Sequence, residues 1–182
     1  MAEQDSTTPI SGNGDQAALA GGEGPQVAAL AQYVKDLSVE NPSAPQVYQW
    51  GEQPQLDVQF NINVNKVADE VHEVVLKIDA SARSGSGVHF VIDLSYGGIF
   101  ALRNLPEEAI APFLLVEAPR LLFPFARQVI AAATSDAGFP PLMLDPIDFA
   151  AIYMAQAQAA QQQQQPGELG GNDAGNGTPT VQ

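Results

Sequence analysis

The chain has 182 residues, 45% of them apolar, and its 21 acidic residues outnumber seven basic ones for a net charge of −14. This charge opposes binding to nucleic acid and anionic lipid, so basic or apolar partners are favoured. The absence of cysteine excludes disulfides and thiolate metal sites. We expect a cytoplasmic protein that does not cross a membrane, because no apolar run is long enough and residues 1–26 lack the bases of a targeting segment.

Both ends of the chain have compositions typical of disorder. Residues 1–26 are rich in Gly, Ser, Thr, Asp and Gln, and the other end runs from a glutamine tract into a Gly- and Asn-rich stretch. Such segments bury too little apolar surface to offset the entropy of ordering them. We therefore predict one domain, residues 27–159, between a disordered N-terminal extension and a disordered Gln/Gly-rich tail, residues 160–182. The domain keeps fifteen acids against seven bases.

Alternation of apolar and polar residues predicts four strands in the first part of the domain. The first covers residues 33–40, with Tyr33, Lys35, Leu37 and Val39 on one face and Val34, Asp36, Ser38 and Glu40 on the other. The others cover residues 56–65, 73–80 and 88–95, with a turn at 81–87 between the last two. The long proline-containing passage at 42–54 predicts a crossover rather than a tight hairpin.

Helical signals fill the last third of the domain. Pro106, followed by two glutamates, predicts a helix start, and Pro112 should distort or end that helix. Pro119 opens a second helix, which has apolar residues at helical spacing and ends before Gly138. Residues 145–148, with two aspartates and a proline, cap a third helix. Strands followed by helices predict an α+β fold, a four-stranded antiparallel sheet with helices packed on one face.

Residue types that carry catalysis elsewhere have structural explanations here. His72 lies among acids at a strand start, where polar side chains are normally solvated. Asp145 and Asp148 resemble a catalytic carboxylate pair but fit the cap and the first turn of the third helix. Gly97 and Gly98 lack the lysine of a phosphate-binding loop, and a bulge or close backbone contact explains them better. We therefore expect no enzyme activity, no cofactor and no metal site.

Residues 121–149 predict an exposed binding surface. An apolar helix leads there into a loop rich in Phe, Pro and Leu, which exposes more apolar area than a connector needs. The helix is apolar on more than one side, which is consistent with burial between subunits. Together with GGIF at 97–100, ENPSAP at 40–45 and FPFAR at 123–127, this pattern resembles the SecB family of protein-export chaperones.

The resemblance implies an assembly and an activity. SecB-like protomers pair through sheet edges, and the dimers join through helices into a homotetramer. They bind unfolded preproteins in hydrophobic grooves, keep them competent for translocation and deliver them to SecA, the translocation ATPase. Aromatic and aliphatic side chains can bury extended apolar segments without demanding a fixed sequence; burial in the protomer's own core is the alternative for each. The matching peptide-binding positions are Val47, Tyr48, Trp50, Phe139, Leu142, Leu144, Ile147 and Phe149.

A second surface is also implied by the resemblance. Asp36, Glu40, Val91 and Asp93 match positions at which the family docks the small basic zinc-binding tail of SecA, the zinc belonging to the partner. Family members often have glutamate where this chain has Asp93, so that contact has a shorter reach here. An ordinary solvated sheet face is the alternative. The rival function is a SecB-like chaperone dedicated to one client, such as an antitoxin; the retained carboxylates favour a link to SecA.

Overall fold

A computed structural model describes residues 24–163 of the chain, with side chains to residue 159. The segments expected to be disordered lie almost wholly outside the described residues. The elements, in order, are β1 Gln26–Glu40, the 3-10 turn η1 Gln46–Gln49, β2 Gln55–Ala68, β3 Val71–Ser84, β4 Gly87–Arg103, α1 Glu107–Pro112, the π-helical turn η2 Phe113–Glu117, α2 Ala118–Asp136 and α3 Phe149–Gln163.

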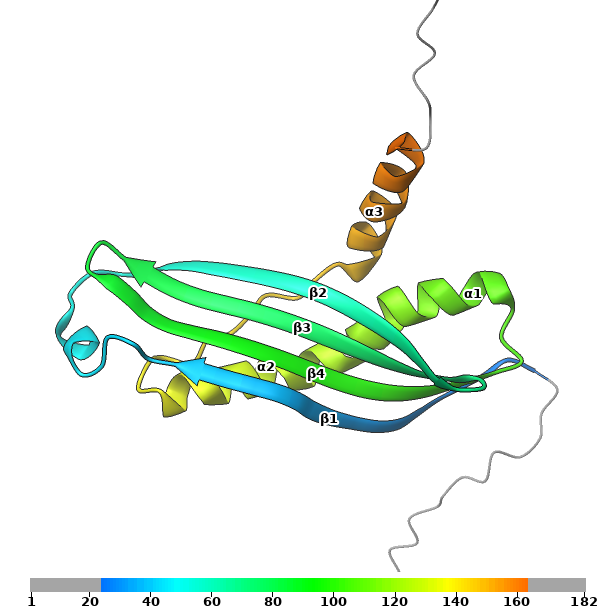
Figure 1. Cartoon of the computed structure of the whole chain (residues 1–182), viewed down its shortest axis with the longest axis horizontal. Helices are drawn as coiled ribbons and strands as arrows, with labels where there is room; N and C mark the ends of the chain where they lie inside the picture. Colours follow the sequence, from blue (N-terminus) through cyan, green and yellow to red (C-terminus); the bar gives the residue numbers. More distant parts are fainter. Residues whose placement is uncertain (1–23, 164–182) are drawn as a thin grey trace, which may run out of the picture.

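The strands form one antiparallel sheet in the order β1-β4-β3-β2, with α1 and α2 on one face (Figure 1). This confirms the predicted fold class. β1 pairs with β4, so the first two strands occupy opposite edges and the passage through η1 is a crossover, as predicted. The predicted turn at 81–87 is too long, because β3 continues to Ser84 and only Gly85 and Ser86 turn the chain.

The core lies between the sheet and α2. Every second residue along β3 and much of β4 points toward the helices and is buried, which fits the predicted alternation. Fully burying one Val, Leu, Ile or Phe side chain of this set contributes about 1.5–3 kcal/mol relative to leaving it exposed. The main contributors are Val74, Leu76, Ile78, Ala80, Ala82, Phe90, Ile92, Leu94, Phe100 and Leu102 from the sheet, and Leu122, Ala126 and Ile130 from α2.

β1 does not keep one unbroken alternation. Its pairing with β4 skips Lys35, since Tyr33 lies opposite Gly97 but Asp36 lies opposite Ser95. A bulge of this kind moves the residues after it to the other face of the strand. Tyr33 and Asp36 therefore share the helix-free face, and the prediction that put them on opposite faces is wrong. The bulge also leaves the apolar side chains of Leu37 and Val39 on the helix side, about 40% exposed at the sheet edge.

Residues 107–136 are helical throughout. Proline lacks an N–H and crowds the preceding turn, and directly after Pro112 the helix widens into the π turn η2. The predicted distortion is therefore confirmed. α2 begins at Ala118 with Pro119 in its first turn, as predicted, but no break precedes it because Glu117 already has helical backbone angles.

By length and composition alone, the run 107–136 is apolar enough to cross a membrane, a test that core helices also pass. Here Leu122, Ala126 and Ile130 are fully buried against the sheet. On another side of α2, Leu121 and Phe125 are 49% and 48% exposed, so the helix is apolar on more than one side, as the sequence predicted.

α3 projects away from the sheet (Figure 1). Its N-terminus is capped by Asp148, whose Oδ1 accepts the Ala151 N–H at 3.0 Å. The cap is therefore Asp148 rather than Asp145, which lies in the irregular segment before the helix.

Candidate functional site

The crossover loop and the segment after α2 enclose a groove of about 680 Å³ at one end of the sheet, here called the crossover groove. Five of the eight predicted peptide-binding residues line it: Val47, Tyr48, Trp50, Phe139 and Leu142. Its other lining residues are Glu52, Gln53, Pro54, Leu56, His89, Phe90, Gly138, Pro140 and Pro141. The structure thus brings together two segments that lie about ninety positions apart in the chain.

Tyr48 fastens the crossover loop to the end of α2. Its hydroxyl donates to the Ala137 carbonyl at 2.9 Å and accepts from Asn41 Nδ2 at 2.7 Å. The Tyr48 ring also lies against Phe139, with ring centroids 5.8 Å apart, and remains 53% exposed. The tyrosine therefore holds the groove's two sides together while one face of its ring stays open.

Two strand residues that sequence reasoning did not place in the groove complete its aromatic wall. His89 meets Trp50 edge-to-face at 5.0 Å, and Phe90 lies 5.1 Å from Phe139. The His89 ring is buried and its Nε2 lies 3.0 Å from Ser84 Oγ, which fixes its orientation. Only the packing of the β3–β4 hairpin against the crossover loop could have revealed these positions, because β4 and the loop are far apart in sequence.

The segment after α2 is held by Thr134. This fully buried residue donates its hydroxyl to the Ile130 carbonyl at 3.0 Å, and its Oγ1 accepts the Leu142 N–H at 2.8 Å. A backbone N–H that would otherwise be unpaired near the groove is thereby satisfied. Leu142 is positioned by this contact and remains half-buried in the groove wall.

Glu52 ties the groove's rim to the β3–β4 turn. Its carboxylate accepts the Ser86 N–H at 3.2 Å. Hydrogen bonds from Ser84 and then Ser86 lower the pKa of Glu52. The rim therefore carries one negative charge beside a largely apolar groove.

The three remaining predicted peptide-binding residues lie outside the crossover groove. Leu144 and Phe149 are 6% and 1% exposed and belong to the core, and Ile147 is half-buried against it. Phe149 also borders a second hollow of about 310 Å³ with Phe60 and Tyr153. Core packing thus accounts for Leu144 and for most of Phe149.

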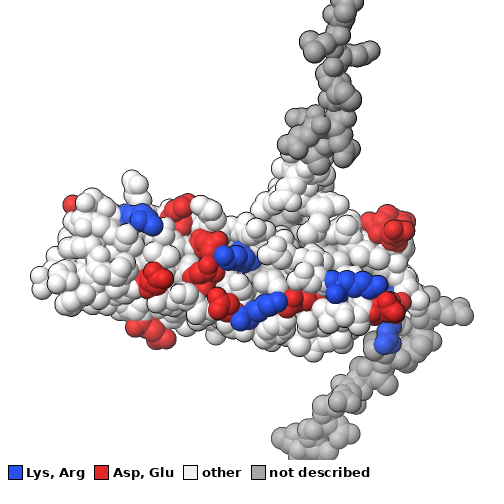
Figure 2. All heavy atoms as spheres, in the orientation of Figure 1, with Lys and Arg blue, Asp and Glu red and all other residues white. Residues whose placement is uncertain are grey.

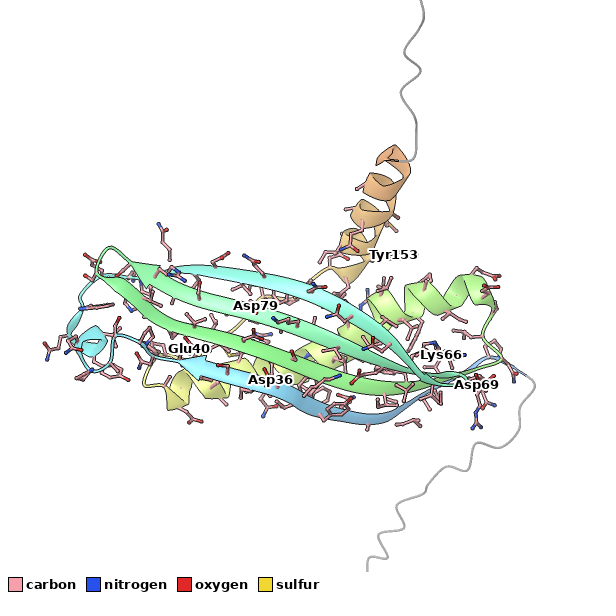
Figure 3. All side chains as sticks on the ribbon, in the orientation of Figure 1. Asp36, Glu40, Lys66, Asp69, Asp79 and Tyr153 are labelled. Atoms are coloured by element: carbon pink, nitrogen blue, oxygen red, sulfur yellow. The ribbon has the colours of Figure 1, made fainter. Side chains whose placement is uncertain are left out.

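The four predicted partner-binding residues lie together on the helix-free face, here called the carboxylate face. Glu40 pairs with Val91, and Asp93 lies opposite Ser38 between Glu40 and Asp36. Figure 2 looks onto this face, where the charged side chains gather, and Figure 3 labels Asp36 and Glu40 along β1.

Lys77 lies between two aspartates on the same face. Its Nζ is 3.1 Å from Asp93 Oδ2 and 3.5 Å from Asp79 Oδ1. Asp79 and Asp93 are directly opposite each other on β3 and β4, which is unfavourable for two like charges unless a cation lies between them. The hydrogen bond to Asp93, followed by the charges of both aspartates, raises the pKa of Lys77.

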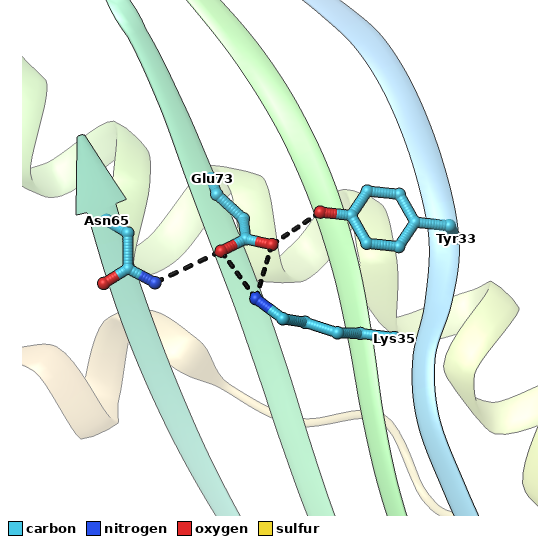
Figure 4. Close-up of polar contacts among 4 residues, drawn as sticks. All are labelled: Tyr33, Lys35, Asn65 and Glu73. Carbon is cyan, nitrogen blue, oxygen red and sulfur yellow. Dashed lines mark hydrogen bonds and ion pairs between the residues drawn. The ribbon is translucent and has the colours of Figure 1, made fainter. Parts of the chain in front are cut away.

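A polar cluster clamps β1 across the sheet (Figure 4). The buried Glu73 carboxylate on β3 accepts from the Tyr33 hydroxyl, from Lys35 Nζ at 2.7 and 2.8 Å and from Asn65 Nδ2 at 3.2 Å. Tyr33 reaches Glu73 by crossing β4 at Gly97, where an added Cβ would lie 2.9 Å from the tyrosine ring. A close contact at this glycine was predicted, and it is confirmed.

The same cluster perturbs two titrating groups. Hydrogen bonds from Lys35 and then Tyr33 lower the pKa of Glu73 to about 2. The hydrogen bond to Glu73, followed by burial, raises the pKa of Tyr33 to about 12. Both shifts favour the charged carboxylate beside the neutral phenol.

Comparison with known proteins gives close relatives. Residues 21–161 match the sequence profile of the family described as "Preprotein translocase subunit SecB". The "Protein-export protein SecB" of Zymomonas mobilis is 57% identical over 134 residues, which are 74% of this chain and 82% of the relative. The protein of the same name from Sphingopyxis alaskensis is 51% identical over 158 residues, 87% of each chain.

A solved structure shares the fold. The SecB-like chaperone of Mycobacterium tuberculosis, solved in complex with a peptide from the HigA1 antitoxin, superposes with a TM-score of 0.55. It is 16% identical in sequence, and the match covers 66% of this chain and 90% of that one. With its profile match, its relatives and its sheet-and-helix architecture, the chain belongs to the SecB family of protein-export chaperones.

Proposed function

We propose that this protein binds unfolded preproteins in the crossover groove, keeps them competent for translocation and delivers them to SecA. The observation that carries the proposal is the groove itself, which joins five aromatic or aliphatic side chains from two distant segments. A wall of rings and branched side chains offers apolar contact area without a fixed pattern of hydrogen bonds. That chemistry suits unfolded chains of many sequences better than one small ligand.

The edge of the sheet supports the same proposal. β2 is an edge strand, and it runs from Leu56 at the crossover groove past Phe60 and Ile62 at the second hollow. An extended client can add to such an edge through backbone hydrogen bonds while its side chains enter pockets alongside. Phe149, Ile152 and Tyr153 line the second hollow together with β2, so α3 contributes to the surface along which an extended client would lie.

The carboxylate face supplies a complementary site for SecA. Acidic side chains on a flat sheet face attract a small basic tail and steer its approach. Val91 lies among the carboxylates and offers an apolar contact beside them. We therefore assign Asp36, Glu40, Val91 and Asp93 to docking of the zinc-binding SecA tail, with the zinc held by the partner.

Exposed apolar surface supports a homotetramer built as a dimer of dimers. The helix-side edge of β1 exposes Val34, Leu37 and Val39, and α2 exposes Leu121 and Phe125. Apolar patches of this kind on soluble proteins mark contact surfaces. The β1 edge suits pairing of two sheets, and the outer side of α2 suits the joining of two dimers.

The function proposed is binding and transfer in the cytoplasm, without catalysis. The named relatives are protein-export proteins, which favours export over a chaperone dedicated to one client. A pull-down from cytosol distinguishes the two, because an export chaperone retains many preproteins and a dedicated one retains a single protein.

Native mass measurement with and without an unfolded preprotein tests the proposal. We expect a species of four chains of 19.2 kDa that gains the mass of bound client. A monomer at micromolar concentration would contradict the assembly. A tetramer that never gains client mass would contradict the holding function.

A further inference from the structure

Lys77 and Arg83 both lie beside Asp93 on the carboxylate face. Among the described residues, Asp36 and Glu40 make no ion pair, whereas Asp93 is paired with Lys77 at 3.1 Å. A cationic group that approaches the face therefore meets two open carboxylates and one that is already neutralised. A cation that docks at Asp93 must therefore compete with Lys77 for that carboxylate.

Lys77 already contacts a second carboxylate. Asp79 Oδ1 lies 3.5 Å from Lys77 Nζ, on the side away from β1. All three side chains are between 37% and 47% exposed, so Nζ can shift from one carboxylate to the other without leaving solvent. Because both contacts are exposed, neither is strong enough to lock the lysine in place.

Resting on the docking function proposed above, we infer that Lys77 is a specificity-determining residue that masks Asp93 until a cationic side chain of the partner displaces it onto Asp79. Asp79 then retains the displaced lysine, and the incoming cation takes its place at Asp93. The face thus discriminates among basic partners, since one that cannot compete with Lys77 reaches only Asp36 and Glu40.

The shape of the face favours lysine or arginine as the displacing group. An open hollow of about 270 Å³ adjoins Asp93, and its lining includes Val91, the three carboxylates of Asp57, Asp79 and Asp93, and one cation, Arg83. A long cationic side chain can lay its methylene stem against Val91 while its charged end meets a carboxylate. The inferred occupant is therefore an extended basic segment with a lysine or arginine seated beside Val91.

Substitution of Lys77 tests the inference directly. Lys77→Met removes the charge and keeps an unbranched apolar stem. Titration calorimetry with the isolated zinc-loaded SecA tail should show about two- to fivefold tighter binding than the parent, the range expected for one exposed charge pair. Lys77→Arg keeps the charge and should bind the tail like the parent.

Substitution of Asp79 distinguishes displacement of Lys77 from a general effect of charge on tail affinity. Asp79→Asn leaves Lys77 with Asp93 as its only carboxylate, so affinity for the tail should fall about two- to threefold. In the Lys77→Met background the same Asp79→Asn change should weaken binding by less than in the parent, because only the charge of Asp79 in the hollow is lost and no lysine remains to be retained. Such non-additivity is the signature of a coupled pair.

Lys66→Met is the matched control. Lys66 forms an exposed pair with Asp69 at the β2–β3 hairpin, toward the other end of the sheet (Figure 3). Lys66→Met changes the net charge by the same amount as Lys77→Met. It therefore measures any gain in affinity for the tail that comes from net charge alone. The inference is overturned if both methionine variants bind the tail equally, or if Asp79→Asn weakens binding equally in both backgrounds.

Failure of the docking function gives a different pattern of affinities from failure of the masking role of Lys77. If neither the parent nor Lys77→Met binds the tail, the docking site and the masking role are both rejected. If the parent binds through Asp36 and Glu40 but Lys77→Met gives no gain, the masking role alone is rejected. When the lysines of the tail peptide are acetylated, the parent, Lys77→Met and Lys77→Arg should bind it with equal affinity.

Discussion

At the scale of single residues, several polar side chains of this protein hold loops and strands in place. Thr134 satisfies the backbone of Leu142, and Tyr48 joins the crossover loop to the end of α2. Glu73 holds β1 to the sheet through Tyr33 and Lys35. The groove therefore depends on polar contacts both in its lining, at Tyr48, and outside it, at Thr134.

Trp50 and Leu142 are the positions at which charge should harm client binding most. Trp50→Asp or Leu142→Asp is expected to weaken capture of a reduced, unfolded model substrate about tenfold or more, because burying a charge under an apolar segment is unfavourable. The tetramer should persist. Gln49→Asp, in the same loop but outside the groove lining, is the control. Unchanged capture by both groove variants would remove these residues from the client site.

Glu73 should give the protein a distinct acid dependence of stability. Because its pKa is lowered to about 2 from 4.5, its contribution is complete above pH 4.5 and is lost as pH falls toward 2. Glu73→Gln should therefore lower the free energy of unfolding by about 1–3 kcal/mol at neutral pH. The curves of variant and parent should converge near pH 2.

Chemical unfolding followed through the single tryptophan, at one protein concentration, measures this difference. Glu70→Gln is the control, since it removes the same charge from an exposed hairpin position. A difference between Glu73→Gln and parent that stays constant from neutral pH to pH 2 would show that the clamp's charge is irrelevant.

At the scale of elements, the sheet and α2 fit together through a glycine. An added Cβ at Gly98 would lie 2.7 Å from Leu122 Cδ2 and 2.8 Å from Phe100 Cε2. Gly98→Ala should force α2 away from β4 and lower the free energy of unfolding by about 1–3 kcal/mol, as overpacking does. Gly51→Ala, with no atom within 4 Å, should change it by less than about 0.5 kcal/mol. Equal effects of both substitutions in urea unfolding would contradict this contact.

The strands and helices were largely predictable because each has its own local signal. The alternation at 56–65 and the proline and acids at 106–108 each identify an element without knowledge of the others. The bulge at Lys35 was not predictable, because it arises from pairing between β1 and β4 and from the clamp on Glu73. A strand without this bulge would place Tyr33 and Asp36 on opposite faces of the sheet.

The candidate site was predictable to the extent that its residues are apolar and lie in loops. Val47, Trp50 and Leu142 meet in the groove as expected, whereas Leu144 has the same residue type and lies in the core. Sequence composition cannot separate these cases, because burial depends on which way the segment after α2 turns. Similarly, His89 enters the groove only through the fold of the hairpin beneath it.

At the scale of the whole molecule, the two proposed surfaces are spatially separate. The crossover groove lies between the loop and the end of α2, and the carboxylate face lies on the helix-free side of the sheet. A protein with this arrangement can hold a client and contact a second partner at the same time. Charge changes on the sheet should therefore leave client capture intact.

Removing three charges tests this separation. The combined change Asp36→Asn, Glu40→Gln and Asp93→Asn should weaken binding of the SecA tail about tenfold, with little change in side-chain volume. Repetition around a symmetric assembly should enlarge the loss when intact SecA is used. Added salt should weaken the parent's binding too, because exposed charges are screened beyond about 8 Å at physiological ionic strength.

The control for this variant removes three charges elsewhere. Asp69→Asn, Glu70→Gln and Glu108→Gln alter the β2–β3 hairpin and the start of α1 instead. Titration calorimetry with the SecA tail and a client-capture assay compare the two triple variants with the parent. Equal tail affinity in the first variant and the parent would mean that Asp36, Glu40 and Asp93 only solvate the sheet.

The outer edge of β2 also bears on the protein's own solubility. An edge strand that accepts an extended client offers the same backbone groups to β2 of another copy, which is how sheet proteins begin to aggregate. The edge has polar Asn61, Asn63 and Asn65 on one side but half-buried apolar residues on the other. With a net charge of −14, separate copies repel one another while a neutral or basic unfolded chain is still admitted. The backbone groups of the β2 edge would accept a second copy of the protein as well as an unfolded client. Long-range charge repulsion thus keeps the second copy away and lets the client reach the edge.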